Sequence, residues 1–406
     1  MASQTRLASG WLVVLVVSAL VLSAALVAAD DHGRTRGPIR LLTTVPIPKN
    51  PLVAFDISWV DPDSQRYYLA DRSNAVIDVI DARHDTFVRQ IQGRFKGFTG
   101  SNDTSGPNGV TVSGHWLFVS DAPSRVVAID LRNDTIVGEV STGGAADLRA
   151  DELAYDPQDG MLLVVNNADS PPFATLIQVD RHTGKLTLGQ RLTFAEATGG
   201  AEQPVWDPKT RRFYLSIPEV NGPGGTGPDG AVARINPRTA TVEAMFPVKF
   251  CQPAGLALGP RQDLLLGCSV SFDTAGNAWT ATDTNTAAPI SVIMDARNGA
   301  IDRNVPGVSG NDEVWFNPGD GQYYLAARAQ PGGPVLGVID AESQTLRQVV
   351  PTFNTPASAP APRGTAHSVA ANPRNNHVFV PLPANNVFPD CLNGCVAVYG
   401  TAGDDD

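Results

Sequence analysis

The sequence predicts an all-β protein, a seven-bladed β-propeller built from four-stranded antiparallel blades. Similar heptads recur along the chain: "DELAYDP" begins at residue 151, "EQPVWDP" at 202 and "DEVWFNP" at 312. Alignment on the Asp-Pro or Asn-Pro turn extends the series to seven copies that begin roughly 43 to 58 residues apart, a period typical of propellers. Each copy also contains four short apolar or alternating segments separated by turn residues. Six blades plus an odd element is the alternative count.

The four segments of each copy follow one order. A short alternating run such as "ELAY" comes first, and it usually ends in Asp-Pro or Asn-Pro, which suit the first two positions of a type I turn. A second segment such as "RYYLA" or "RFYLS" is rich in aromatic and branched residues, as β-strands are. A third such as "VIDVID" ends in Asp, and a fourth such as "TFVRQI" contains Thr. The copies begin at residues 55, 108, 151, 202, 254, 312 and 367.

The seventh copy has no fourth segment after its third. The unassigned segment "IRLLTTVPI", residues 39–47, has the pattern of a strand and lies before the first copy. We therefore expect it to supply the fourth strand of the seventh blade and to close the ring. This predicts one propeller domain over residues 39–400, followed by an acidic tail at 401–406.

The N-terminal segment is typical of a targeting signal. Residues 1–29 contain one basic residue, then an apolar run, then small residues before Asp30. This pattern predicts a signal peptide over 1–29 and a flexible leader over 30–38, and it places the mature chain in the secreted or periplasmic space. The apolar run is long, so an uncleaved N-terminal anchor is the alternative, and it is the only route by which we expect membrane contact.

The four cysteines suit an oxidising compartment. Cys251 and Cys268 flank a strand–turn–strand pattern almost symmetrically, so they can face each other across a hairpin. Cys391 and Cys395, in "CLNGC", can close a small loop. The chain has no CxxC pair, so we predict two structural disulfides rather than a metal or redox site.

The first copies resemble a known family of repeats. The stretch "YYLADRSNAVIDVIDARHDTFV" (67–88) resembles the YVTN-type repeat of seven-bladed surface-layer and periplasmic propellers, in which Ser-Asn follows the second strand. The resemblance is good in the first two copies and partial in the third, sixth and seventh. A weaker resemblance to gluconolactonase- and regucalcin-like propellers implies a central metal held by carboxylates and asparagines from the inner strands. One fold serves many functions, so neither resemblance fixes an activity.

Equivalent residues enter the first strand of each blade and are expected at one mouth of the central channel. Counting back five positions from the turn gives Asp56, Asn108, Asp151, Glu202, Ala254, Asp312 and His367. Converging carboxylates at low dielectric must either take up protons or bind a cation. The predicted metal ligands are Asp56, Asn108, Asp151, Glu202 and Asp312. The alternative is that each acid satisfies backbone N–H groups at the start of its strand.

The predicted cofactor is a divalent cation, because the candidate ligands are rich in oxygen. Calcium is favoured, since it binds carboxylate and amide oxygens. His367 as an additional ligand would favour zinc or manganese. His367, Glu152 and Glu313 are the candidate catalytic residues, because an imidazole or carboxylate beside a metal can act as a base on water.

A second layer of residues is predicted at the rim of the same mouth. These residues belong to the loops between second and third strands, and they include Asp71, Arg72, Asp121, Asn167, Trp279 and Arg328. Long inserts at 221–230, 272–289 and 385–395 fall in the same class of loop, and such loops commonly form a binding rim. Trp279 can equally pack against its own loop.

Two functions fit these features. The first is a metal-dependent hydrolase of the lactone or ester type. The second is a non-catalytic YVTN-type propeller that binds a small-molecule or cationic ligand, or a protein partner, at the channel mouth. The formal net charge of −11 argues against a nucleic acid as partner. The chain also contains no GxSxG, HExxH or P-loop motif.

Overall fold

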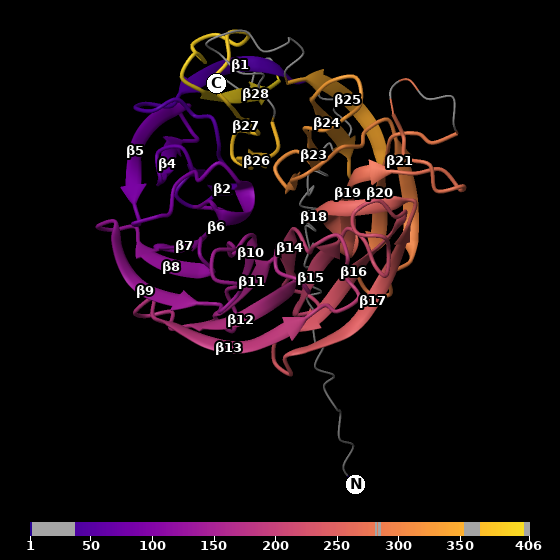
Figure 1. Ribbon diagram of the computed structural model, residues 1–406, viewed down its shortest axis with the longest axis horizontal. Coiled ribbons are helices and arrows are strands. Elements are labelled where there is room, and N and C mark those ends of the chain that lie inside the picture. Colours follow the sequence, from indigo (N-terminus) through magenta and orange to yellow (C-terminus); the bar gives the residue numbers. More distant parts are fainter. Residues whose placement is uncertain (2–36, 281, 283–285, 353–365, 402–406) are drawn as a thin grey trace. The chain divides into compact units, whose positions relative to one another are not determined.

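The described residues from 37 onward form seven four-stranded antiparallel sheets, arranged as blades around a central axis (Figure 1). The computed structural model describes Met1 and residues 37–280, 282, 286–352 and 366–401. The predicted seven-bladed propeller is therefore confirmed. Apart from Met1, the predicted signal peptide lies outside the described residues, as do most of the leader and most of the acidic tail. Among the described residues, no helix is long and apolar enough to span a bilayer.

Blades one to three follow the predicted repeat. Blade one contains β2 (Ser58–Asp61), β3 (Arg66–Asp71), β4 (Val76–Asp81) and β5 (Thr86–Gln92). Blade two follows a short 3-10 helix, η1 (Asn102–Thr104), and contains β6 (Val110–Ser113), β7 (Trp116–Asp121), β8 (Arg125–Asp130) and β9 (Thr135–Ser141). Blade three contains β10 (Leu153–Asp156), β11 (Met161–Asn166), β12 (Phe173–Val179) and β13 (Leu186–Thr193).

Blades four to six have the same strand order. Blade four contains β14 (Pro204–Asp207), β15 (Arg212–Ile217), β16 (Asp229–Asn236) and β17 (Thr241–Lys249). Blade five contains β18 (Cys251–Leu258), η2 (Pro260–Gln262), β19 (Asp263–Ser271), β20 (Ile290–Asp295) and β21 (Ile301–Pro306). Blade six contains β22 (Val314–Asn317), β23 (Gln322–Ala327), β24 (Val335–Asp340) and β25 (Thr345–Pro351).

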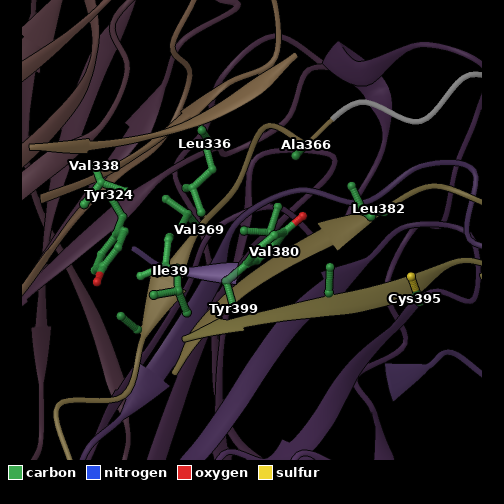
Figure 2. Packing of buried hydrophobic residues seen from close by; sticks show 14 of the residues in the cluster. Ile39, Tyr324, Leu336, Val338, Ala366, Val369, Val380, Leu382, Cys395 and Tyr399 are labelled. Carbon is green, nitrogen blue, oxygen red and sulfur yellow. The ribbon is translucent and has the colours of Figure 1, made fainter. Parts of the chain in front are cut away.

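Blade seven joins the two ends of the domain. It contains β26 (Ala370–Ala371), β27 (Val378–Leu382), β28 (Cys395–Gly400) and the N-terminal β1 (Arg40–Pro46), which pairs antiparallel with β28. The predicted closure by residues 39–47 is thus confirmed. Ile39, just before β1, packs in the buried cluster with Tyr399 and with Tyr324 of blade six (Figure 2). Its backbone also bonds to the Gln348 amide of blade six at 2.9 Å.

The turn Asp or Asn between the first two strands explains why the repeat is so regular. Asp156 Oδ1 accepts the Gln158 N–H at 2.8 Å, and Asp207 Oδ1 accepts the Lys209 N–H at 2.9 Å. Asn317 repeats this contact with the Gly319 N–H at 3.1 Å. These side chains are buried, so each satisfies a backbone donor that the tight turn would otherwise leave unpaired.

Both predicted disulfides are confirmed. Cys251 and Cys268, on neighbouring strands β18 and β19, are bonded with their Cα atoms 5.2 Å apart. Cys391 and Cys395 are bonded with their Cα atoms 4.9 Å apart, and they close the loop that leads into β28. All four cysteines of the chain are therefore paired, as an oxidising compartment permits.

Candidate ligand-binding pocket at the channel mouth

The predicted entry residues occupy equivalent backbone positions in their blades. In five blades the entry residue donates its N–H to a carbonyl of the second strand, at 2.7–3.1 Å. The five donors are Asp56, Asn108, Asp151, Glu202 and Asp312. The repeat therefore gives all five residues the same backbone contact at the start of their blades.

Neighbouring blades are linked at this level by a second set of backbone hydrogen bonds. The residue after an entry residue donates its N–H to the carbonyl of the entry residue in the next blade. The four donor–acceptor pairs are Ile57 to Asn108, Gly109 to Asp151, Gln203 to Ala254, and Glu313 to His367. These bonds fix the entry residues of adjacent blades relative to one another, so the ring is held by backbone and not only by side chains.

A pocket of about 70 Å³ lies at this mouth and is walled mainly by charged side chains. Its carboxyl groups belong to Asp56, Asp151, Glu152, Glu202, Asp312 and Glu313. Arg149, Arg328 and His367 also line it, together with Asn102 of η1 and Ile57. The volume is room for roughly two water molecules, so the pocket can take only a small group.

Asp56 is the carboxylate that the protein's own cations neutralise most strongly. Arg72, 2% exposed, donates from Nη2 to Asp56 Oδ2, and Arg149 Nη1 donates to the same oxygen at 3.1 Å. His367 Nε2 lies 3.5 Å from Asp56 Oδ1, and its ring stacks on Phe55 with centroids 4.5 Å apart. Burial disfavours the ionised form, but the two guanidinium groups outweigh it and lower the pKa of Asp56. Asp56 is therefore ionised at neutral pH.

Asp151 and Glu202 have the opposite behaviour. Burial raises the pKa of Asp151 to about 7, although Arg149 Nη2 lies 2.8 Å from its Oδ2. Burial, and then the charges of Asp151 and Asp312, raise the pKa of Glu202 to about 8. Both groups are therefore partly protonated near neutral pH, mainly because they are buried and also because neighbouring carboxylates repel a further negative charge.

Glu152 and Glu313, one residue further along their strands, form a pair across the channel. Glu152 belongs to blade three and Glu313 to blade six, and both side chains are buried, at 6% and 3% exposure. Burial and their mutual interaction, which includes a hydrogen bond, raise the pKa of Glu152 well above its usual range. Burial also raises the pKa of Glu313 well above its usual range. These shifts favour a state in which at least one of the two carboxyl groups is protonated at neutral pH.

Deeper in the channel, the inner strands contact one another through larger side chains. The Gln203 amide donates to the Val314 carbonyl at 3.2 Å and accepts the Leu256 N–H at 2.6 Å, which connects blades four, five and six. The indole of Trp59 meets that of Trp315 edge to face, with centroids 5.0 Å apart. These contacts link blades one, four, five and six to one another.

The predicted metal ligands mostly contact arginines. Asp56 and Asp151 contact Arg149, Asn108 Oδ1 accepts from Arg72 Nε at 3.0 Å, and Asp312 Oδ2 lies 3.1 Å from Arg328 Nε. Within the described residues, no group of three or more His, Cys, Asp or Glu side chains is arranged to hold a metal ion. The five residues as they stand do not fit a metal as one ligand set, and divalent-cation binding stays a prediction.

The predicted rim residues separate into two groups. Arg328 lines the pocket, and Arg72 lies behind its wall. Asp71 and Asp121 are buried within their blades instead, because their carboxylates accept hydrogen bonds there: Asp71 from Asn74, and Asp121 from Arg125 and the Lys96 N–H. Trp279 is partly buried, and its backbone N–H donates to the Ser271 carbonyl of its own blade at 2.8 Å. Asn167 lines a different cavity.

Arg149 is the main residue that sequence reasoning missed. It lies in the loop between β9 and β10, two residues before Asp151, and its N–H is held by the Asp103 carbonyl at 2.8 Å. Asn102 was missed too, and its Oδ1 accepts from Arg72 Nη1 at 3.2 Å. Both residues precede a predicted entry residue, but neither occupies a position that the repeat defines.

Comparison with known proteins supports the fold and leaves the family open. No family model matches the chain, and no curated protein matches it. Among solved structures, the chain is similar to Kuenenia stuttgartiensis hydrazine synthase, with a TM-score of 0.64, 13% identity, and coverage of 88% of this chain and 97% of that chain. Solved structures provide 1628 matching chains, so the likeness identifies a widely used propeller fold and does not select an activity.

Proposed function

We propose that this protein is an extracytoplasmic propeller that binds a small cationic ligand at the mouth of its central channel. One observation carries this proposal: six carboxyl groups and three guanidinium groups, counting Arg72 behind the wall, meet around one pocket. The excess of acids favours an occupant with positive charge.

The size of the pocket limits the occupant. About 70 Å³ accommodates the ammonium end of a primary amine but not a whole drug-sized ligand, whose pockets usually measure some 300–1,000 Å³. A primary ammonium group has three donors, and the partly buried carboxyl groups of Glu202 and Asp312 line the pocket and offer acceptors.

Proton release is expected to accompany binding. A cation favours the ionised forms of Asp151 and Glu202, whose pKa values of about 7 and about 8 leave them partly protonated near neutral pH. Affinity should therefore rise with pH between about 6 and about 8, because fewer protons then compete with the ligand.

The location and the binding role have separate support. The signal-like N-terminus and the two disulfides favour an oxidising, extracytoplasmic compartment. The YVTN-type resemblance of residues 67–88 favours a propeller that binds rather than catalyses.

Isothermal titration calorimetry with methylammonium chloride tests the proposal. We expect saturable binding that releases protons, seen as a dependence of the heat on the ionisation enthalpy of the buffer. Glu202→Gln and Asp312→Asn should each weaken binding by about tenfold, the loss of one charge-assisted hydrogen bond. The matched control is Glu342→Gln, whose carboxylate is 86% exposed and pairs with Arg261. Equal affinity in wild type and both pocket variants would refute the proposal.

A metal-dependent hydrolase of the lactone or ester type is the second candidate. His367 favours it, because its imidazole lines the pocket and faces Asp56, as a base for water would. A metal would have to use carboxylates that now contact arginines, so we derive no catalytic step through it. Elemental analysis of protein purified without chelator, with an ester and lactone screen, tests this candidate. A stoichiometric metal that turnover requires would favour it over simple binding.

A further inference from the structure

We infer that the cavity beside the pocket, between blades three and four, receives the uncharged body of a primary amine whose ammonium group enters the channel mouth. This inference rests on the proposed function and extends it to a ligand class. The cavity measures about 670 Å³. That is within the usual range for small-molecule sites of roughly 300–1,000 Å³, whereas the channel pocket is not.

Three loops of the same face form the cavity. They are the β11–β12 loop with Asn167 and Pro171, the β13–β14 loop with Ala195 and Thr198, and the insert after β15 with Pro223. The loops leave a hollow on the face that carries the entry residues, so a ligand can reach it from solvent.

A buried carboxylate holds the insert in place. Glu219, 0% exposed, accepts hydrogen bonds from the Gly224 and Gly225 N–H groups at 2.7 Å, from the Gly227 N–H and from Thr198 Oγ1 at 2.6 Å. Thr198 belongs to the opposite loop, so Glu219 ties two cavity walls together. The cavity is thus a preformed feature and not a gap between free loops.

Gly200 lies beside both the cavity and the channel pocket. Gly200 lines the cavity, and a methyl group on its Cα would lie 3.5 Å from Glu202 Oε1 and 3.4 Å from the Asn167 carbonyl oxygen. Those two oxygens are therefore within about 7 Å of each other. A linear chain of about five carbons can span that distance, so one ligand can occupy both sites.

The chemistry of the walls defines the body of the ligand. Pro171, Pro172 and Pro223 provide apolar surface, and the Asp169 carboxylate is engaged by the Ala145 N–H at 2.7 Å. These walls suit an uncharged body with an apolar stem.

Calorimetry with three amines tests this inference. The probes are methylammonium, 1-aminopentane and 5-amino-1-pentanol. We expect both longer amines to bind at least about tenfold tighter than methylammonium, because their methylene groups leave water.

A cavity-filling variant separates this inference from the proposed function. Ala195→Trp places a large side chain in the exposed cavity wall, and it should remove the advantage of the longer amines while leaving methylammonium binding unchanged. His182→Trp, in the exposed turn between β12 and β13, is the matched control. If methylammonium binds but longer amines bind no tighter, this inference is refuted and the proposed function stands. If methylammonium does not bind, the proposed function is refuted and this inference falls with it.

Discussion

Arg149 Nη2 lies 2.8 Å from Asp151 Oδ2, and the two side chains are only 10% and 4% exposed. The same guanidinium also contacts Asp56 from blade one, so one loop residue joins the carboxylates of two non-adjacent blades. Removal of one partner from such a buried pair usually costs far more than the pair contributes, because the other charge stays buried.

Arg149→Ala should therefore destabilise the fold by about 3–5 kcal/mol, which urea denaturation can measure. Arg94→Ala is the control, since Arg94 is 74% exposed and its ion pair with Glu139 should contribute at most about 1 kcal/mol. Equal effects of the two substitutions would contradict this account of the pocket.

The stability of the protein should fall as pH rises from about 5 to about 8. Asp151 and Glu202 have folded pKa values of about 7 and about 8, above their ordinary values of 3.8 and 4.5. Between the ordinary and the folded-state pKa values, the folded protein binds more protons than the unfolded chain. The stability that these two groups contribute is therefore fully present below their ordinary pKa values and is lost as pH rises through their folded-state pKa values. Asp56 has the opposite effect on the pH dependence, because folding lowers its pKa. Its contribution to stability is lost only when pH falls below its ordinary pKa of 3.8.

Thermal melting across this pH range checks the prediction, and Glu202→Gln should flatten the curve because it removes one of the two groups. A melting temperature that rises steadily from pH 5 to pH 8 in the wild type would show that the sign is wrong.

The pair of Glu152 and Glu313 should keep a protonated carboxyl group at neutral pH. Infrared spectroscopy detects this as the carbonyl stretch of a protonated acid, and the band should lose intensity in the double variant Glu152→Gln/Glu313→Gln. Asp151 and Glu202, which are partly protonated near neutral pH, should account for the intensity that remains. Glu342→Gln, on an 86% exposed side chain, should leave the band unchanged. An identical spectrum in wild type and double variant would rule out a protonated carboxyl group in this pair.

The two disulfides should contribute unequally to stability. Cys251 and Cys268 are 17 residues apart, so their loss in a double alanine variant should cost about 3 kcal/mol. Cys391 and Cys395 are 4 residues apart, and the shorter closed loop predicts about 2 kcal/mol. Denaturant unfolding of both double variants measures the difference, and a larger cost for the shorter loop would argue against loop closure as the main cause.

Ring closure through β1 should be essential for the fold. Val45→Asp places a charge at a position that is 2% exposed in the cluster with Phe379 and Val396, and it should cost roughly 4 kcal/mol or more. Thr43→Asp, at an exposed position of the same strand, is the control. Proteolysis that begins at blade seven in the first variant but not in the second would support this role, whereas equal resistance would contradict it.

Most of the fold could be predicted because its determinants are local and repeated. Asp156, Asp207 and Asn317 each satisfy the backbone of their own turn, so a seven-residue window already specifies the first strand and the turn that follows it. The same period places Asp56, Asp151, Glu202 and Asp312 at equivalent positions, so the sequence repeat alone predicts a ring of acidic residues.

The sequence by itself therefore determined the blade count, the strand that closes the ring, the disulfide pairs and the ring of entry residues. Tertiary structure alone decided how that ring is neutralised. Arg149 lies outside the repeat, and Glu152 meets Glu313 only because blades three and six face each other across the channel. Gly200 likewise lies beside Asn167 of the preceding blade only in the folded chain. These relationships depend on distances and burial across the whole ring, and no local window of sequence contains the low dielectric that shifts the pKa values of these groups.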